Sequence, residues 1–97
     1  MKRLYDLLND YFSNDKDIEI SFENNEIMIE INEKYHYREL RIFSENEFIY
    51  INDFSFDNED NEELELFRIN SILYELNDNK LNLLILNFIQ NFIDIIE

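Results

Sequence analysis

The side chains of this sequence that could do chemistry are mostly carboxylates. Residues 53–65, DFSFDNEDNEELE, hold seven acidic residues in thirteen positions and no lysine or arginine. These acidic residues are Asp53, Asp57, Glu59, Asp60, Glu62, Glu63 and Glu65. Carboxylates can act in acid–base catalysis, in binding hard cations, or in electrostatic recognition of a basic partner. The rest of the sequence helps to decide among these three uses.

Catalysis has little support. His36 is the single histidine, cysteine is absent, and the absence of glycine removes the phosphate-binding loops that need close backbone approach. No serine lies in a recognisable nucleophile motif. A pair such as Glu19 and Glu30 could exchange protons, but 23 acidic residues in a chain of 97 produce such pairs by crowding. We therefore predict that the protein is not an enzyme and that His36 is an ordinary strand residue.

Metal binding is the second possible use of the carboxylates. The run from Asp57 to Glu63 is rich in oxygen ligands, but it lacks the glycine and the ligand spacing of an EF-hand loop. The absence of cysteine also removes thiolate sites and disulfides, which fits a reducing cytoplasm. We expect neither a metal site nor another cofactor.

The composition indicates that the net charge of −15 is selected. Ile and Asn occur fifteen times each while Ala, Gly, Pro, Val, Thr, Cys and Trp are absent, as an AT-rich coding sequence would produce. The same bias should favour lysine, whose codons share two letters with those of asparagine, yet there are four lysines. A large net negative charge destabilises a compact state through self-repulsion. This net charge is also larger than solubility requires. It also disfavours nucleic-acid binding, because neutralising phosphates takes clustered Lys and Arg.

Length and hydropathy predict one soluble domain. With 45% apolar residues, residues 1–97 can bury their own core. Asp6, Asn9 and Asp10 interrupt the N-terminal residues where a signal peptide needs an apolar run. The apolar stretch from 81 to 97 is interrupted by polar residues and is short for a membrane span. We expect a cytoplasmic protein with no membrane partner and no direct nucleic-acid partner.

The spacing of apolar residues predicts an N-terminal helix and then a hairpin. A three-four spacing in residues 2–12 favours a helix, with its apolar side formed by Leu4, Leu7, Leu8, Tyr11 and Phe12. From residue 18 the period changes to two, which predicts two strands joined by a turn at Asn24-Asn25. The expected pairs are Phe22 with Ile27, Ile20 with Ile29 and Ile18 with Ile31 on one face, and Glu19 with Glu30 and Glu23 with Glu26 on the other. Like charges placed directly opposite are unfavourable, so stability does not explain the second set.

The remaining chain predicts two more strands and two helices. Strands at 35–43 and 47–54 can join at Glu45-Asn46, which places Ile42 opposite Ile49 and Leu40 opposite Ile51. Their other face would carry charges together with Tyr37, Phe43, Phe48, Tyr50 and Phe54. Asp60 and Glu63 resemble a capping box and predict a helix from about residue 61, with a buried side formed by Leu66, Phe67, Ile69, Leu73 and Leu76. A last helix, about 80–96, carries apolar residues on more than one side.

The predicted fold class is therefore α+β. We expect a helix, a four-stranded antiparallel meander and two C-terminal helices, with the helices packed on one face of the sheet. The wide apolar surface of the last helix is explained by a central position among the other elements, or by a homodimer interface.

This organisation resembles that of the small acidic anti-CRISPR proteins of phages. The resemblance is carried by the leading MKRLYDLLNDYF, the strands DIEISFE and EIMIEIN, and the acidic NEDNEELE before two expected helices. Some members combine a helix, a short antiparallel sheet and two helices. The resemblance implies a DNA mimic that occupies the duplex-binding or PAM-reading cleft of a CRISPR effector, where Arg and Lys normally meet DNA.

We predict an acidic inhibitor that blocks the nucleic-acid-binding surface of a CRISPR effector or similar phage-defence nuclease. Its partner-binding residues are predicted to be the acidic residues of 53–65 named above, together with Glu19, Glu23, Glu26, Glu30, Tyr37, Tyr50 and Phe54. Two alternatives remain open: an immunity protein or antitoxin that neutralises a basic nuclease toxin, and a dimeric structural or adaptor protein in which the charge prevents aggregation.

Overall fold

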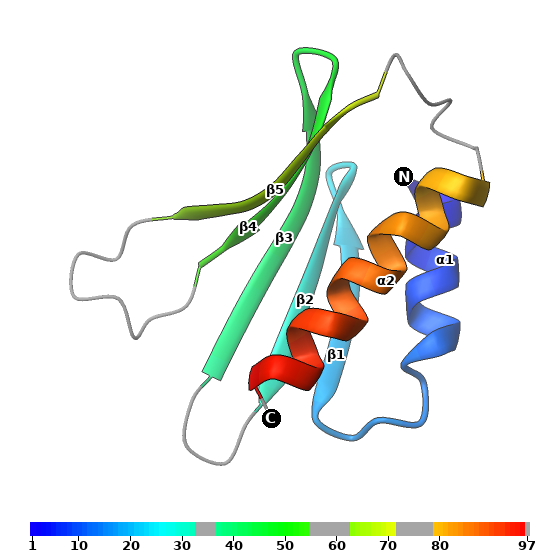
Figure 1. The fold of residues 1–97 in the computed structure, drawn as a ribbon. Helices are drawn as coiled ribbons and strands as arrows, with labels where there is room; N and C mark the ends of the chain where they lie inside the picture. The colour runs from blue at the N-terminus through cyan, green and yellow to red at the C-terminus, as the bar shows by residue number, and fades with distance from the viewer. Residues whose placement is uncertain (33–36, 55–62, 72–78, 97) are drawn as a thin grey trace.

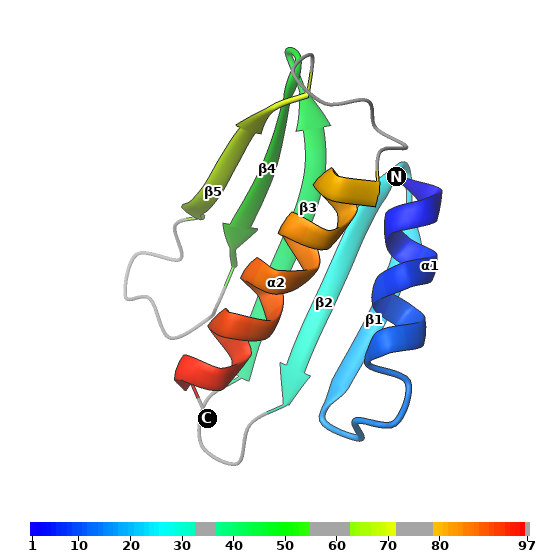
Figure 2. The ribbon, with the colours of Figure 1, turned by 45° about the vertical axis from the view of Figure 1, so that its right-hand side comes forward.

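In the part of the chain that the structure describes, the protein forms one antiparallel sheet with two helices on the same face. The computed structural model describes residues 1–32, 37–54, 63–71 and 79–96. The order of elements is α1 (Lys2–Tyr11), β1 (Ile18–Glu23), β2 (Glu26–Asn32), β3 (Tyr37–Glu45), β4 (Phe48–Asp53), β5 (Leu64–Asn70) and α2 (Asn79–Ile96). The strands lie in the sheet in sequence order. Both helices pack on one side of this sheet, as Figures 1 and 2 show, which confirms the predicted α+β arrangement.

The core lies between the helices and the strands that they cover. Isoleucines at alternate positions of β2 point toward the helices, and Ile27, Ile29 and Ile31 are at most 2% exposed. Leu4 and Leu8 of α1 and Leu81, Ile85 and Ile89 of α2 close the same cluster. The expected apolar side of α1 is correct except for Tyr11, which is 55% exposed.

The first hairpin has the predicted register. Ile18 pairs with Ile31, Ile20 with Ile29 and Phe22 with Ile27. The two turn residues, Asn24 and Asn25, have φ values of 54° and 58°. Asparagine tolerates this left-handed region better than most residues, which is why the turn falls at the Asn-Asn pair.

The second hairpin differs from the prediction by two residues. The turn lies at Asn46-Glu47, so Ile42 pairs with Ile51 and Leu40 with Asp53. The predicted partners of Ile42 and Leu40 were therefore wrong. A shift of two residues leaves every side chain on the face that the alternation assigns to it, because the side-chain period of a strand is two.

Glu47 should be an unfavourable residue at its position in this turn. Its φ is 70°, a region that costs a residue with a β-carbon about 1–2 kcal/mol. We expect Glu47→Gly to raise the free energy of unfolding by about 0.5–1 kcal/mol, since glycine also loses more entropy on folding. Urea unfolding measures the change, with Glu47→Gln as the control that removes the charge and keeps the β-carbon. An equal gain in both variants would attribute the effect to charge.

The predicted helix from about residue 61 is wrong for the residues that the structure describes there. Residues 64–70 form the fifth strand and pair antiparallel with β4. The edge of β4 offers backbone hydrogen-bonding groups that a strand can satisfy and a helix cannot. Phe67 and Ile69 still face the core, as predicted, but from a strand. Asp60 of the capping box, and Leu73 and Leu76 of the predicted helix, lie outside the described residues.

The last helix agrees with the prediction in extent. Leu81, Ile85, Leu86 and Ile93 are buried as part of the core. Ile89 is also fully buried, although its role was not predicted. By contrast, Leu84 and Ile95 are 42% and 82% exposed.

Candidate functional site

The side of the sheet turned away from both helices is the candidate site, and we call it the open face. Alternation along each strand divides the side chains, so the residues beside the core isoleucines point to this side. No helix among the described elements covers it (Figures 1 and 2). The strand registers place on it Glu19, Ser21, Glu23, Glu26, Met28, Glu30, Tyr37, Glu39, Arg41, Phe43, Glu45, Phe48, Tyr50, Asn52, Glu65, Arg68 and Asn70.

Three glutamates form a row across the first three strands. Glu19 of β1 pairs with Glu30 of β2, and Glu30 pairs in turn with Glu39 of β3. Glu19 is exposed and Glu30 is partly exposed, whereas Glu39 is 8% exposed. Neighbouring strands lie about 4.8 Å apart, so this carboxylate row places three negative charges side by side. Like charges directly opposite each other in a ladder are destabilising. Two consecutive ladder pairs of this kind indicate that folding stability did not select these residues.

Tyr37 lies two residues before Glu39 on β3, beside the carboxylate row, and its titration is influenced by these charges. The pKa of its hydroxyl is raised above the ordinary value of 10.0, first by burial and then by the negative charges of Glu30 and Glu39. The hydroxyl also donates a hydrogen bond to the Glu30 side chain, and Glu19 adds a smaller charge effect. Each of these contributions favours the protonated phenol over the phenolate.

We expect the folded protein to hold the Tyr37 proton at pH values where the unfolded chain has lost it. The free energy of unfolding should therefore fall as the pH rises above about 10 and level off once the folded pKa is passed. NMR of the Cζ carbon between about pH 9 and about pH 12 measures the titration directly. Glu30→Gln should lower this pKa, because it removes a neighbouring charge. A Cζ midpoint below 10 in the native protein would contradict the assigned environment.

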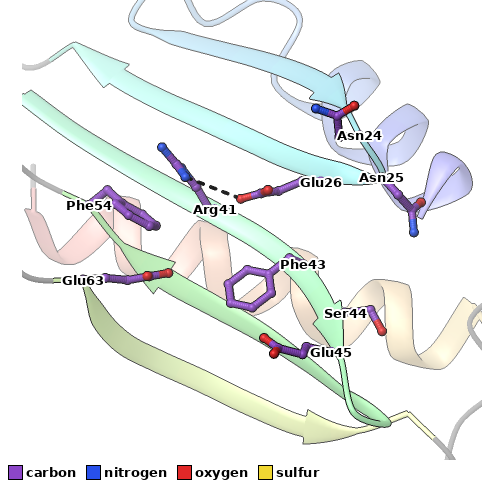
Figure 3. A pocket seen from close by; sticks show the side chains of 9 residues that line it. All are labelled: Asn24, Asn25, Glu26, Arg41, Phe43, Ser44, Glu45, Phe54 and Glu63. Atoms are coloured by element: carbon purple, nitrogen blue, oxygen red, sulfur yellow. Dashed lines mark ion pairs between the residues drawn. The ribbon is translucent and has the colours of Figure 1, made fainter.

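A second acidic group surrounds a hollow at the other end of the face. The hollow has a volume of about 430 Å³ and is lined by Asn24, Asn25, Glu26, Arg41, Phe43, Ser44, Glu45, Phe54 and Glu63. Figure 3 shows these side chains projecting from the hairpin turn of β1 and β2 and from the strands beside it. We call this feature the acidic-aromatic hollow.

Arg41 is held at one side of the acidic-aromatic hollow by two contacts. Its Nη1 lies 3.8 Å from Oε1 of Glu26, and its guanidinium carbon lies 3.8 Å from the centroid of the Phe54 ring. Both charged side chains are about one third exposed. The hollow therefore already holds a guanidinium group between a carboxylate and an aromatic ring.

The fifth strand brings part of the predicted acidic segment onto the open face. A shift in register at Ile51/Asn52 pairs Glu65 with Asn52, while Arg68 pairs with Tyr50. Because paired residues share a face, this irregularity places both Glu65 and Arg68 beside the other open-face residues. Glu63, just before the strand, accepts a hydrogen bond of 2.6 Å from the Asn52 amide. Because residues 64–70 form a strand, these acids become part of the sheet surface. A helix from residue 61 would have kept them apart from the sheet.

The predicted partner-binding residues thus fall into three groups. The open face, with the hollow at its edge, holds Glu19, Glu23, Glu26, Glu30, Tyr37, Tyr50, Phe54, Glu63 and Glu65. Asp57, Glu59, Asp60 and Glu62 lie outside the described residues. Asp53 lies on the helix-facing side, 6% exposed, with Oδ2 3.7 Å from Nη1 of Arg38. We therefore leave Asp53 out of the candidate interface.

Sequence reasoning missed two acids and one aromatic residue of this site. Glu39 completes the carboxylate row, and Glu45 and Phe43 line the acidic-aromatic hollow. The alternation of β3 assigned Glu39 and Phe43 to the open face. The pattern of one strand could not show that Glu39 lies opposite Glu30. The missing information was the register between β2 and β3.

The described residues supply charge and aromatic surface rather than a metal-binding geometry. Within residues 1–32, 37–54, 63–71 and 79–96, no group of three or more His, Cys, Asp or Glu side chains is arranged to hold a metal ion. His36 lies outside these ranges. In the same part of the chain, no helix is both long enough and apolar enough to cross a bilayer.

Comparison with known proteins gives no further information on the function. No protein-family model, curated protein or solved structure matches the chain. The function is therefore argued from the open face and its neighbours.

Proposed function

We propose that this protein is an acidic inhibitor that binds, through its open face, the nucleic-acid-binding surface of a basic protein. A CRISPR effector or a similar phage-defence nuclease in the host cytoplasm has such a surface. The observation that carries the proposal is the pairing of Glu30 with both Glu19 and Glu39, two like-charged ladder pairs that cost stability. Glu19 is exposed and Glu30 is partly exposed, so these two carboxylates are the ones a partner can reach, whereas Glu39 is buried. A surface kept at a cost to folding is best explained by binding.

The spacing of the acids suits a target that normally binds a nucleic-acid duplex. Glu19 and Glu23 lie four residues apart on β1, as do Glu26 and Glu30 on β2, which separates the two ends of the face by about 13 Å. This separation is of the same order as the groove widths of B-DNA, about 6 and 12 Å. Complementary charge would also accelerate capture of a basic cleft.

Aromatic side chains give the same face a means of tight binding. Phe43 and Tyr50 stack with their ring centroids 5.2 Å apart, and Tyr37 and Phe54 are half-buried at their own positions. Aromatic residues are enriched among the side chains that contribute most to protein interfaces. In this proposal the acids steer the partner and the rings hold it.

Capture followed by nucleic-acid competition tests the proposal. The tagged protein is incubated with lysate from bacteria that carry CRISPR systems, and captured proteins are eluted at about 0.5 M salt, where surface charge is screened. Each purified partner is then titrated with labelled DNA or RNA in the presence of the inhibitor. We expect nucleic-acid binding to weaken by about tenfold or more. A partner that binds its nucleic acid with unchanged affinity would contradict the proposal, and a nuclease toxin would identify an immunity protein.

Exposed apolar residues support self-association as a second candidate function. On α2, Leu84 and Ile95 are exposed and lie on the same side of the helix as Phe88, whose ring is 5.0 Å from that of Phe67 on β5. Leu64 at the start of β5 is 51% exposed. β5 is also an edge strand of the sheet, and an exposed edge can pair with another chain.

If these residues form a dimer interface, Ile95→Asp should produce a monomer. Sedimentation velocity of the native protein and the variant measures the change. Ile95 is 82% exposed, so the substitution should change the free energy of unfolding of the monomer by no more than about 0.5 kcal/mol. Equal sedimentation coefficients for the two proteins at all concentrations would eliminate this helix as a dimer interface.

A further inference from the structure

We propose that the acidic-aromatic hollow is a binding site for an arginine side chain of the partner protein. The inference rests on the proposed function only for the origin of that arginine. The guanidinium would lie against the Phe43 ring and between carboxylates of Glu26, Glu45 and Glu63 (Figure 3). These side chains come from β2, β3 and the residue before β5, so the site exists only in the assembled sheet.

The first argument is that the hollow already holds a guanidinium of its own. Arg41 lies over the Phe54 ring at 3.8 Å and reaches Glu26 at 3.8 Å. The contacts that recognise arginine are therefore present in an intramolecular form: an aromatic face on one side and a carboxylate on the other. Phe43 offers a second ring in the same hollow.

The second argument is the charge that Arg41 leaves in place. Three carboxylates line the hollow, those of Glu26, Glu45 and Glu63, against one arginine. Glu45 is exposed, and Glu63 uses one oxygen to accept the hydrogen bond from Asn52. A carboxylate retains further acceptor sites after one such bond. The lining therefore remains negative and can accept N–H donors from an incoming cation.

The third argument concerns which cation fits. A guanidinium is planar, presents five donors and stacks on aromatic rings, whereas an ammonium is compact and strongly hydrated. The Phe43 ring is stacked on Tyr50, which fixes its plane and leaves it as a rigid platform. A volume of about 430 Å³ also admits the aliphatic stem of the side chain. These features favour arginine over lysine.

Titration with a blocked amino acid tests the site without any partner. N-acetyl-arginine methylamide is added to the ¹⁵N- and ¹³C-labelled protein, with the ionic strength held constant by sodium chloride. We expect resonances of Phe43, Arg41 and Phe54 to shift with a dissociation constant of about 1–10 mM, and blocked lysine to bind several-fold more weakly. The Glu45→Gln and Glu63→Gln double variant should weaken arginine binding by about fivefold or more.

The matched control removes two charges from the other end of the face. Glu19→Gln with Glu30→Gln has the same net charge as the double variant of the hollow, and should leave arginine binding within about twofold. Equal effects of the two double variants would show non-specific screening and overturn the inference. So would equal binding of blocked lysine, or the absence of localised shifts.

The outcome is separable from that of the proposed function. A protein that binds no blocked arginine but still displaces nucleic acid from its partner would contradict the inference alone. Arginine binding without any effect on nucleic-acid binding would support the site and contradict the inhibitor.

Discussion

Replacing Glu19, Glu23 and Glu30 by lysine should weaken binding to the captured partner by about a hundredfold or more. All three lie on the open face, and Glu30 is the centre of the carboxylate row. Charge reversal converts attraction to repulsion at each position, and like charges placed against each other across an interface cost several kcal/mol. Surface plasmon resonance should show most of the loss as slower association at low salt, because steering acts on the encounter.

The matched control reverses three acids elsewhere. Asp6 and Asp10 on α1 and Asp94 on α2 are exposed on the helices, which lie on the other side of the sheet. Their replacement by lysine changes the net charge by the same amount, so it separates position from total charge. We expect this control to lose less than about fivefold in affinity. Equal losses in the two variants would mean that only the overall charge attracts the partner.

The same open-face variant should fold at least as well as the native protein. In the triple variant, the lysine at position 23 faces Glu26 and the lysine at position 30 faces Glu39, while the lysines at positions 19 and 30 face each other. In the single variant Glu30→Lys, the new lysine forms favourable pairs with both Glu19 and Glu39. Opposite charges in a ladder contribute about 0.2–1 kcal/mol for each pair. Glu30→Lys is therefore expected to gain stability while it loses binding, as a surface selected for recognition should.

The sequence predicts the first hairpin well because two signals agree there. The alternating isoleucines define the faces, and Asn24-Asn25 is a turn pair that accepts positive φ. In the second hairpin the alternation is equally clear, but turns at Glu45-Asn46 and Asn46-Glu47 both keep it. The observed turn places Glu47 at a φ of 70°, which propensity alone does not favour. Because such a turn has positive φ at both positions, a turn at Glu45-Asn46 would also place a glutamate in this region, so local preference does not distinguish the two registers.

The fifth strand could not be predicted from local pattern. Residues 64–70 carry apolar side chains at spacings that fit a helix, and the register irregularity next to Asn52 breaks strict alternation. The deciding factor is the unpaired edge of β4, which exists only once the other strands have assembled. The open face was predictable in composition, since alternation assigns its residues. Its continuity from Glu19 to Glu65 depends on registers that no single strand specifies.

Asp53 shows how charge density alone misassigned a residue. It belongs to the acidic segment, yet it follows Ile49 and Ile51 at the spacing that points toward the core. Arg38 precedes Leu40 and Ile42 at the same spacing and reaches Asp53 from the neighbouring strand. The alternation of β3 and β4 contained this information. The Asp53 carboxylate therefore has a structural role, unlike the carboxylates of the open face.

We expect Asp53→Asn to lower the free energy of unfolding by about 2–3 kcal/mol and the melting temperature by about 10–20 °C. Removing one member of a buried ion pair leaves the other without its counter-charge, a loss of about 3–5 kcal/mol when both are fully buried. The Asp53 side chain is 8% exposed and that of Arg38 is 30% exposed, so the expected loss is smaller. Thermal unfolding followed by circular dichroism measures it.

Two comparisons determine whether the effect belongs to the ion pair. Arg38→Met with Asp53→Leu removes both charges and should recover most of the lost stability, because a well-packed apolar pair replaces a buried ion pair at little cost. Glu45→Gln, an exposed change on the same sheet, should alter stability by no more than about 0.5 kcal/mol. A double variant as unstable as Asp53→Asn would show that other contacts of the carboxylate matter more. Below its melting temperature, Asp53→Asn should still bind the partner with native affinity, because Asp53 is not on the open face.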